Sequence, residues 1–207
     1  MGKVTLPPVY PITPDDLTGS GLADWVHRLL DAGCRFFQYR AKTADDERRL
    51  RDLMRITEDA HRFGAAVIVD DRPDLCLLAG ADGVHVGQSD LPPSAVRRLL
   101  GPAAVIGFST HSPAQAAAAL DEGADYLALG PVFPTRTKTN PDPVLSEEDQ
   151  AAIIQSCPLP ITAIGGITAR RAPELWSRGF ASLAVISAFA KSPDSAWREF
   201  TALLPPR

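Results

Sequence analysis

Residues Ala66–Val86 read Ala-Val-Ile-Val-Asp-Asp-Arg-Pro-Asp-Leu-Cys-Leu-Leu-Ala-Gly-Ala-Asp-Gly-Val-His-Val, and they hold the repeating pattern that decides the fold. Two short apolar runs, Ala66–Val69 and Gly83–Val86, flank a segment that begins near Pro73 and stops at Gly80. A near-continuous apolar run is typical of a parallel strand buried on both faces. A glycine after a helical pattern commonly ends the helix in a left-handed conformation. This stretch therefore predicts strand, helix and strand in succession.

The same alternation runs along the whole chain of 207 residues. Its repetition without a linker or a break in composition predicts one α/β domain over residues 1–207, a single (β/α)8 TIM barrel. A doubly wound open sheet is the alternative, and the number of strands separates the two. The expected strands are Val9–Thr13, Arg35–Tyr39, Ala66–Val69, Gly83–Val86, Val105–Ser109, Tyr126–Leu129, Pro160–Ile164 and Ser182–Val185.

Composition narrows the class of protein. Lys and Arg number 21 against 25 Asp and Glu, a net charge of −4, and no basic run marks a nucleic-acid interface. No stretch approaches the roughly 20 apolar residues that cross a bilayer, and Met1–Tyr10 lacks a signal-peptide core. Cys34, Cys76 and Cys157 are odd in number and far apart, as expected of reduced thiols. We therefore expect a cytoplasmic protein that acts on small molecules, without nucleic-acid or membrane partners; the oligomeric state is left open, a homo-oligomer included.

The stretch Phe36–Lys42, Phe-Phe-Gln-Tyr-Arg-Ala-Lys, places polar residues at alternating positions after an apolar pair. Because side chains of a strand alternate between its faces, Gln38, Arg40 and Lys42 are expected on the same side. An amide and two cations at the carboxyl end of a strand suit a phosphate or diphosphate. The alternative is that both cations are solvated charges that open a loop.

Three carboxylates follow the next two expected strands. Asp70 and Asp71 come after Ala66–Val69, and Asp90 comes shortly after Gly83–Val86. Barrel enzymes place their sites at the carboxyl ends of the strands, and Mg²⁺ takes one or two carboxylates plus substrate phosphates. Asp71 and Asp90 are the candidate ligands. Alternatively, each caps the helix that starts at the proline shortly after it.

A second anion site is expected after the last two strands, where barrels commonly bind phosphate through backbone N–H groups. Gly165–Gly166 permits close approach of the main chain, and Ile186–Ser187 adds a hydroxyl donor. The alternative for the two glycines is a tight turn. The segment Pro134–Pro143 is interpreted as a lid that could bring Lys138 over a bound anion; the alternative is an exposed basic loop.

Two histidines are ambiguous. His111 follows Ser109 at a strand end and is either an acid–base group or part of the start of the next helix. His85 lies inside an apolar strand and is interpreted as a core histidine.

Together these motifs resemble the thiamine phosphate synthase family, from Tyr10 to about Ala190. The resemblance rests on Gln38-Tyr-Arg-Ala-Lys42, Gly83-Val-His-Val-Gly-Gln-Ser-Asp90, Gly107-Phe-Ser-Thr-His111, Gly130-Pro-Val-Phe-Pro-Thr-Arg-Thr-Lys138, Gly165-Gly-Ile167 and Val185-Ile-Ser-Ala188. It implies a (β/α)8 transferase that uses Mg²⁺, joins hydroxymethylpyrimidine pyrophosphate to thiazole phosphate and releases pyrophosphate.

The resemblance also implies roles for single residues. Gln38, Arg40, Lys42, Ser109 and Lys138 would hold the pyrimidine and its pyrophosphate, and four of them (Arg40, Lys42, Ser109 and Lys138) would serve catalysis. Asp71 and Asp90 would hold Mg²⁺. The thiazole phosphate would be held by Thr135, Thr137, Gly166, Ile186 and Ser187.

One departure from the family pattern concerns Asp70, a further candidate substrate-binding residue, which stands where the family usually has an asparagine that can donate to the pyrophosphate. A carboxylate only accepts hydrogen bonds when ionised, so near a polyanion it would repel unless it joins the metal or is protonated. A thiazole tautomerase that uses His111, or a phosphate-binding barrel without activity, is therefore the alternative function. Because Arg40, Lys42 and Lys138 are all present, the synthase is favoured.

Overall fold

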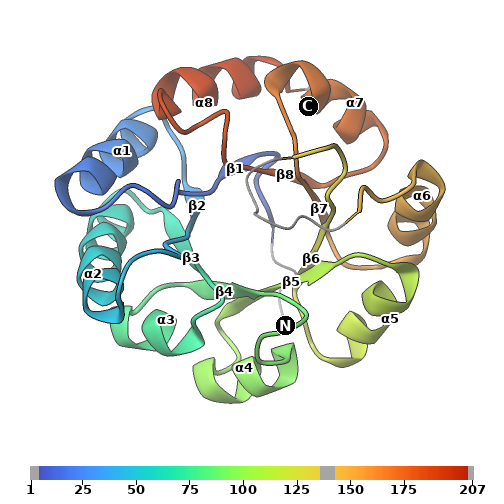
Figure 1. Ribbon diagram of the computed structural model, residues 1–207, viewed down its shortest axis with the longest axis horizontal. Coiled ribbons are helices and arrows are strands. Elements are labelled where there is room, and N and C mark those ends of the chain that lie inside the picture. Colours follow the sequence, from blue (N-terminus) through green and yellow to red (C-terminus); the bar gives the residue numbers. More distant parts are fainter. Residues whose placement is uncertain (1–4, 136–142, 205–207) are drawn as a thin grey trace.

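The structure is a computed structural model, and it describes residues 5–135 and 143–204. Eight parallel strands form one sheet in the order β1-β8-β7-β6-β5-β4-β3-β2. A parallel bridge between Ile12 and Gln38 joins the two ends of this sheet. The helices form a ring around the strands (Figure 1). The predicted (β/α)8 barrel is confirmed, and the open-sheet alternative is wrong.

The strands are short and lie close to their expected positions. They are β1 Tyr10–Pro11, β2 Phe36–Tyr39, β3 Ala66–Asp70, β4 Gly83–Val86, β5 Val105–Thr110, β6 Tyr126–Leu129, β7 Ile161–Ile164 and β8 Ser182–Val185.

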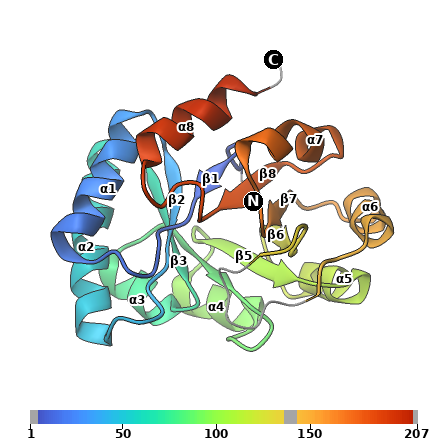
Figure 2. The ribbon, with the colours of Figure 1, turned by 45° about the horizontal axis from the view of Figure 1, so that its top comes forward.

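A helix follows each of the eight strands, and the ring closes where the last helix packs beside the first (Figure 2). The helices are α1 Gly19–Asp31, α2 Asp46–Arg62, α3 Pro73–Ala79, α4 Pro93–Leu100, α5 Pro113–Asp121, α6 Glu147–Ser156, the 3-10 helix η1 Ala169–Arg171, α7 Ala172–Ser177 and α8 Pro193–Ala202. None of the helices in the described ranges has the length and hydropathy that a bilayer span requires.

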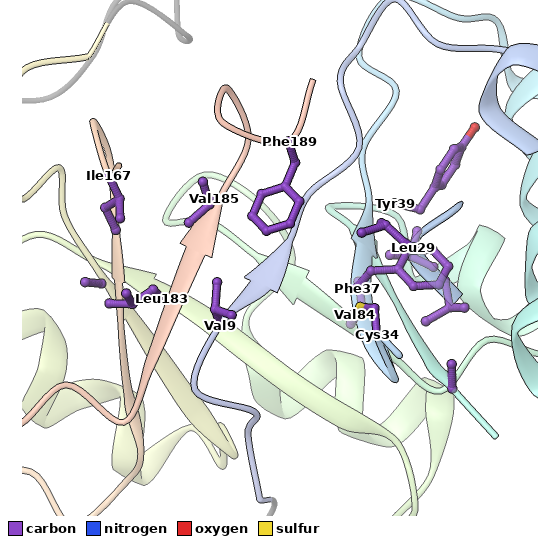
Figure 3. Close-up of a cluster of buried hydrophobic side chains, with 14 of the residues drawn as sticks. Val9, Leu29, Cys34, Phe37, Tyr39, Val84, Ile167, Leu183, Val185 and Phe189 are labelled. Atoms are coloured by element: carbon purple, nitrogen blue, oxygen red, sulfur yellow. The ribbon is translucent and has the colours of Figure 1, made fainter. Parts of the chain in front are cut away.

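All four residues of β2, Phe36–Tyr39, are buried, because both faces of the strand are covered. Phe36 belongs to the cluster inside the barrel, whereas Phe37 and Tyr39 belong to the cluster between strands and helices. The alternation of side chains along a strand therefore fills two apolar layers at once. Figure 3 shows part of the outer layer, where Phe37 and Tyr39 lie near Leu29 of α1.

Aromatic rings fill the inside of the barrel. The ring of Tyr10 lies 5.2 Å from that of Phe36 and 6.5 Å from that of Tyr126, both edge to face. Such contacts stabilise a core beyond the area they bury. Packed side chains therefore fill the interior of the barrel, and the open space lies at the carboxyl ends of the strands.

Ordinary helix starts and stops position the loops at the two ends of the barrel. The helix α3 ends at Gly80, whose backbone is left-handed with φ of 65°, as predicted for a C-cap glycine. The N-cap residue of α2 is Asp45, whose side chain accepts a hydrogen bond from the backbone N–H of Arg48. Gly80 turns the chain back toward the start of β4, whereas the Asp45 cap fixes the end of the loop that follows β2.

Candidate active site

A cavity of about 550 Å³ opens at the carboxyl ends of the strands. Its lining comes from loops after most of the strands, as is usual for this fold. Of the predicted site residues, eleven line this one cavity: Gln38, Arg40, Lys42, Asp70, Asp71, Asp90, Ser109, Thr135, Gly166, Ile186 and Ser187. The remaining two, Thr137 and Lys138, lie outside the described residues, as does most of the expected lid.

The strand pattern of Phe36–Lys42 extends beyond the end of β2. Gln38, Arg40 and Lys42 all face the cavity, although the strand itself ends at Tyr39. The hydroxyl of the buried Thr13 keeps the chain extended: it donates to the Arg40 carbonyl at 2.9 Å and accepts from the Arg40 N–H at 2.8 Å. The alternative of a solvated loop charge is wrong for Arg40, whose side chain is only 12% exposed, whereas the Lys42 side chain is 44% exposed.

Asp15 was not predicted from the sequence, yet it organises the two cations. Its carboxylate forms an ion pair with the Arg40 guanidinium and accepts the backbone N–H of Lys42 at 3.0 Å. A single acidic residue in a loop forms no pattern in the sequence that would predict such a role. Only the closure of the barrel, which brings the loop after β1 beside the loop after β2, reveals this contact.

Asp70 lies at the centre of the polar cluster with its side chain 12% exposed. One oxygen accepts from Gln38 Nε2 at 2.8 Å, and the other lies 3.0 Å from Lys42 Nζ and 3.7 Å from Arg40 Nε. Burial, followed by the charge of Asp71, raises the pKa of Asp70 to about 6, although Lys42 and Arg40 oppose the rise. Asp70 is thus held by the same three side chains that were expected to hold a diphosphate.

Lys42 contacts two carboxylates, those of Asp70 and Asp71. Burial disfavours its charged form, but the negative charge of Asp70 and the hydrogen bonds to both aspartates outweigh burial and raise the pKa of Lys42. The lysine is therefore a permanent cation at neutral pH.

The helix-capping alternative for Asp71 and Asp90 is wrong. The N-cap residues of α3 and α4 are Arg72 and Pro92, and neither helix start has a side-chain cap. Asp71 has a left-handed backbone with φ of 60°, an uncommon conformation for a residue other than glycine. Asp90 instead accepts the backbone N–H of Gly87 at 2.7 Å. Both carboxylates line the cavity.

The two carboxylates fit the needs of a divalent cation. Burial raises the pKa of Asp90, and so do the charge of Asp71 and a hydrogen bond between the two side chains, against the lowering effect of the Gly87 N–H. Two like charges brought this close favour a cation between them. Across residues 5–135 and 143–204, no group of three or more His, Cys, Asp or Glu side chains forms a metal site by itself. A metal here would need oxygens from a ligand, which is how proteins commonly bind Mg²⁺.

The opposite side of the cavity is built from backbone. Gly166 has φ of 64°, and a Cβ atom at this position would lie 2.5 Å from the carbonyl oxygen of Pro134. Only glycine fits there, because both the conformation and the space exclude a side chain. Ser187 is exposed at the tight turn after β8, beside the half-buried Ile186. Among the lining residues that the structure describes, this side of the cavity offers a hydroxyl and main-chain groups instead of charged side chains.

The histidines occupy places that the sequence left open. His85 is 6% exposed and, as predicted, packs in the core, but it also lines the cavity: its Nε2 lies 2.9 Å from Ser109 Oγ and its Nδ1 lies 3.1 Å from the Tyr126 hydroxyl. His111 Nδ1 lies 2.6 Å from the Gly130 carbonyl oxygen, which orients its ring at the cavity wall. The cap of α5 is Ser112, not His111.

The fold and this cavity define the class of protein: an enzyme of the (β/α)8 barrel type, with a cavity of small-molecule size at the carboxyl ends of its strands. Comparison with known proteins makes this more specific. The model of the thiamine monophosphate synthase family matches residues 9–189. The chain therefore belongs to this family.

Individual relatives agree. The chain is 37% identical over 187 residues to the thiamine-phosphate synthase of Lawsonia intracellularis, and the match covers 90% of this chain and 86% of that protein. It is 41% identical over 178 residues to the thiamine biosynthesis bifunctional protein ThiM/ThiE of Symbiobacterium thermophilum; this match covers 86% of the chain but only 37% of that protein. Among solved structures, thiamine phosphate pyrophosphorylase from Pyrococcus furiosus has a TM-score of 0.82 and 32% identity, with 94% of each chain covered.

These comparisons confirm the predicted family, the enzyme class and the place in thiamine biosynthesis. They do not favour the tautomerase or the inactive binding protein as alternatives. They support the coupling reaction that releases pyrophosphate as the activity of this chain.

Proposed function

We propose that this chain is a thiamine-phosphate synthase whose cationic side binds the diphosphate of hydroxymethylpyrimidine pyrophosphate and whose backbone side binds thiazole phosphate. The single observation that carries the proposal is the convergence of Arg40, Lys42, Asp71 and Asp90 at one edge of a cavity that Gly166 and Ser187 line as well. One cavity thus offers two chemically different anion sites, as a reaction between two phosphorylated substrates requires.

The diphosphate would lie against Arg40 and Lys42, because a guanidinium and an ammonium are the side chains best suited to phosphate oxygens. Gln38 and Ser109, which lie deeper at the ends of β2 and β5, would hold the pyrimidine. Lys138, which lies outside the described residues, would add a third cation.

The carboxylates of Asp71 and Asp90 would hold Mg²⁺ together with oxygens of the diphosphate. When bound, the ion neutralises negative charge that develops on the leaving diphosphate. Asp71 also contacts Lys42, so the metal and the lysine would act on the same part of the substrate.

The thiazole phosphate would be held by the backbone around Gly166 and Ile186 and by the Ser187 hydroxyl, with Thr135 and Thr137 at the edge. Backbone N–H groups at a tight turn bind phosphate without a formal charge. A neutral site here keeps this anion apart from the cations that the diphosphate needs.

The reaction requires no nucleophilic side chain. The bond between the pyrimidine methylene carbon and the diphosphate oxygen breaks first, and the diphosphate leaves with the bonding electrons while Arg40 and Lys42 stabilise its charge. The lone pair of the thiazole nitrogen then forms the new carbon–nitrogen bond. The protein contributes charge stabilisation and the alignment of the two substrates.

The test is release of pyrophosphate from both phosphorylated substrates in the presence of Mg²⁺. Arg40→Ala should reduce kcat/KM by roughly a hundredfold or more, since it removes a charged group at the developing charge. The matched control is Arg98→Ala, an exposed arginine on α4, and it should retain full activity. A well-folded protein without turnover would contradict the proposal, as would equal loss in both variants.

The three cysteines of the chain are free. Burial raises the pKa of both Cys34 and Cys76 to about 12, so these thiols are neutral and unreactive at physiological pH. Such a protein suits a reducing compartment, and we propose the cytoplasm as its location.

A further inference from the structure

We propose that Asp70 is an internal counterion that competes with the diphosphate for Lys42 and Arg40, so that it weakens diphosphate binding and favours release of pyrophosphate. The inference rests on the proposed function, since it concerns the same site. It assigns to Asp70 a role opposite to that of a substrate-binding residue.

The contacts of Asp70 carry the argument. Its two oxygens engage Gln38 at 2.8 Å, Lys42 at 3.0 Å and Arg40 at 3.7 Å. These are the groups from β2 and its loop that would otherwise donate to the substrate. A diphosphate that enters must therefore replace a carboxylate that is already paired with the cations, and the free energy of binding is reduced by that exchange.

The charges around the cavity make this competition strong. Among the described residues that line it, the cations Arg40 and Lys42 face three carboxylates, those of Asp70, Asp71 and Asp90. A divalent cation on Asp71 and Asp90 would offset their two charges. The charge of Asp70 would then remain beside both cations, together with that of Asp15, which pairs with the Arg40 guanidinium, and both charges would oppose a polyanion there.

Asp70 has little freedom to avoid this repulsion. Its side chain is only 12% exposed, and it is held by partners from β2 and the loop that follows. Like charges in such a place are screened by solvent and salt far less than at an open surface. The repulsion should therefore persist when pyrophosphate is bound, and it should speed the departure of the product.

The experiment is calorimetric titration of inorganic pyrophosphate in the presence of Mg²⁺ into the full chain and its variants. Asp70→Asn keeps the shape of the side chain and removes its charge. We expect this variant to bind pyrophosphate about tenfold more tightly or better, the effect of one unfavourable charge contact in a partly buried site. Pyrophosphate should also inhibit the variant at correspondingly lower concentration in the coupling reaction.

The matched control is Asp121→Asn, an exposed residue at the end of α5 that changes the net charge by the same amount and should leave the affinity unchanged. Unchanged or weaker binding by a folded Asp70→Asn variant would overturn the inference; weaker binding would mean that Asp70 holds the metal. If Asp70→Asn does not fold, Asp70→Ser is judged by the same criterion.

Lys42→Ala separates this inference from the proposed function. The Lys42→Ala variant should bind pyrophosphate more weakly than the unsubstituted protein does. If Lys42→Ala has no effect, the diphosphate does not bind at this edge of the cavity, and the proposed function and the role of Asp70 are both overturned. If Lys42→Ala weakens binding while Asp70→Asn does not strengthen it, only the role of Asp70 is overturned.

Discussion

His85 Nε2 lies 2.9 Å from Ser109 Oγ, while its other ring nitrogen lies 3.1 Å from the hydroxyl of Tyr126. The three residues come from the neighbouring strands β4, β5 and β6. There is room for them because Gly107 has no side chain: a Cβ there would lie 2.2 Å from the Tyr126 ring and 2.3 Å from His85. The core of the barrel thus fixes the direction of a hydroxyl that faces the cavity.

His85→Leu should lower kcat/KM for the coupling reaction by roughly tenfold, the worth of one hydrogen bond of about 1–1.5 kcal/mol. The reason is that Ser109 loses the partner that orients it. Ser109→Ala should cost a similar factor, and the double variant should cost little more than either single variant. His85→Gln, which keeps a polar group at this position, should recover part of the activity. Losses that multiply in the double variant would mean that His85 acts independently of Ser109.

Substitution of Asp15 tests whether its ion pair with Arg40 positions the guanidinium for catalysis. Asp15→Ala removes both the ion pair with Arg40 and the acceptor for the Lys42 N–H, so the two cations should lose their fixed positions. We expect kcat/KM to fall by roughly tenfold, through weaker stabilisation of the leaving diphosphate. Asp16→Ala changes the exposed neighbouring residue and should have no effect in the same pyrophosphate-release assay. Equal activity of the two variants would show that Arg40 does not need the ion pair with Asp15 for its function.

The stability of the protein without Mg²⁺ should depend on pH through Asp70. Its pKa is raised from 3.8 to about 6 in the folded state, so its ionised form destabilises the fold, and this cost develops as the pH rises from about 4 to above 6. Asp70→Asn should therefore increase the free energy of unfolding at pH 8, by an amount on the order of a few kcal/mol.

At pH 4 the same variant should have nearly the stability of the natural protein. Urea denaturation at both pH values measures the two differences. An equal increase in the free energy of unfolding at pH 4 and pH 8 would contradict this explanation, because the increase would then not depend on the ionisation of Asp70.

Gly166→Ala should damage the neutral side of the cavity selectively. The left-handed backbone and the contact of 2.5 Å with the Pro134 carbonyl oxygen both oppose a side chain, at a cost of about 1–3 kcal/mol. We expect a raised KM for thiazole phosphate and little change in the affinity for pyrophosphate, measured by steady-state kinetics and calorimetry. Gly21→Ala, in α1 where a Cβ meets nothing within 4 Å, should leave both unchanged and slightly stabilise the helix. A parallel loss for both ligands would mean that the substitution disturbs the whole barrel.

Much of the site could be predicted from the sequence because strand geometry is local. The alternation Gln38, Arg40, Lys42 requires only that the chain stay extended, and the apolar runs with their glycine stops define the order of strands and helices. The carboxyl ends of parallel strands then meet at one face, so the residues that follow each strand could be collected in advance.

The sequence by itself determined the alternation of short buried strands with helices, hence the barrel and the set of residues at its mouth, since these depend on periodicity and on turns. Only the tertiary structure decided how those residues pair. Asp15 contacts Arg40, and His85 contacts Ser109, because closure of the barrel brings distant loops and strands together. The unusual position of Asp70 between Gln38 and Lys42 likewise depends on burial and on neighbouring charges, which no local pattern encodes.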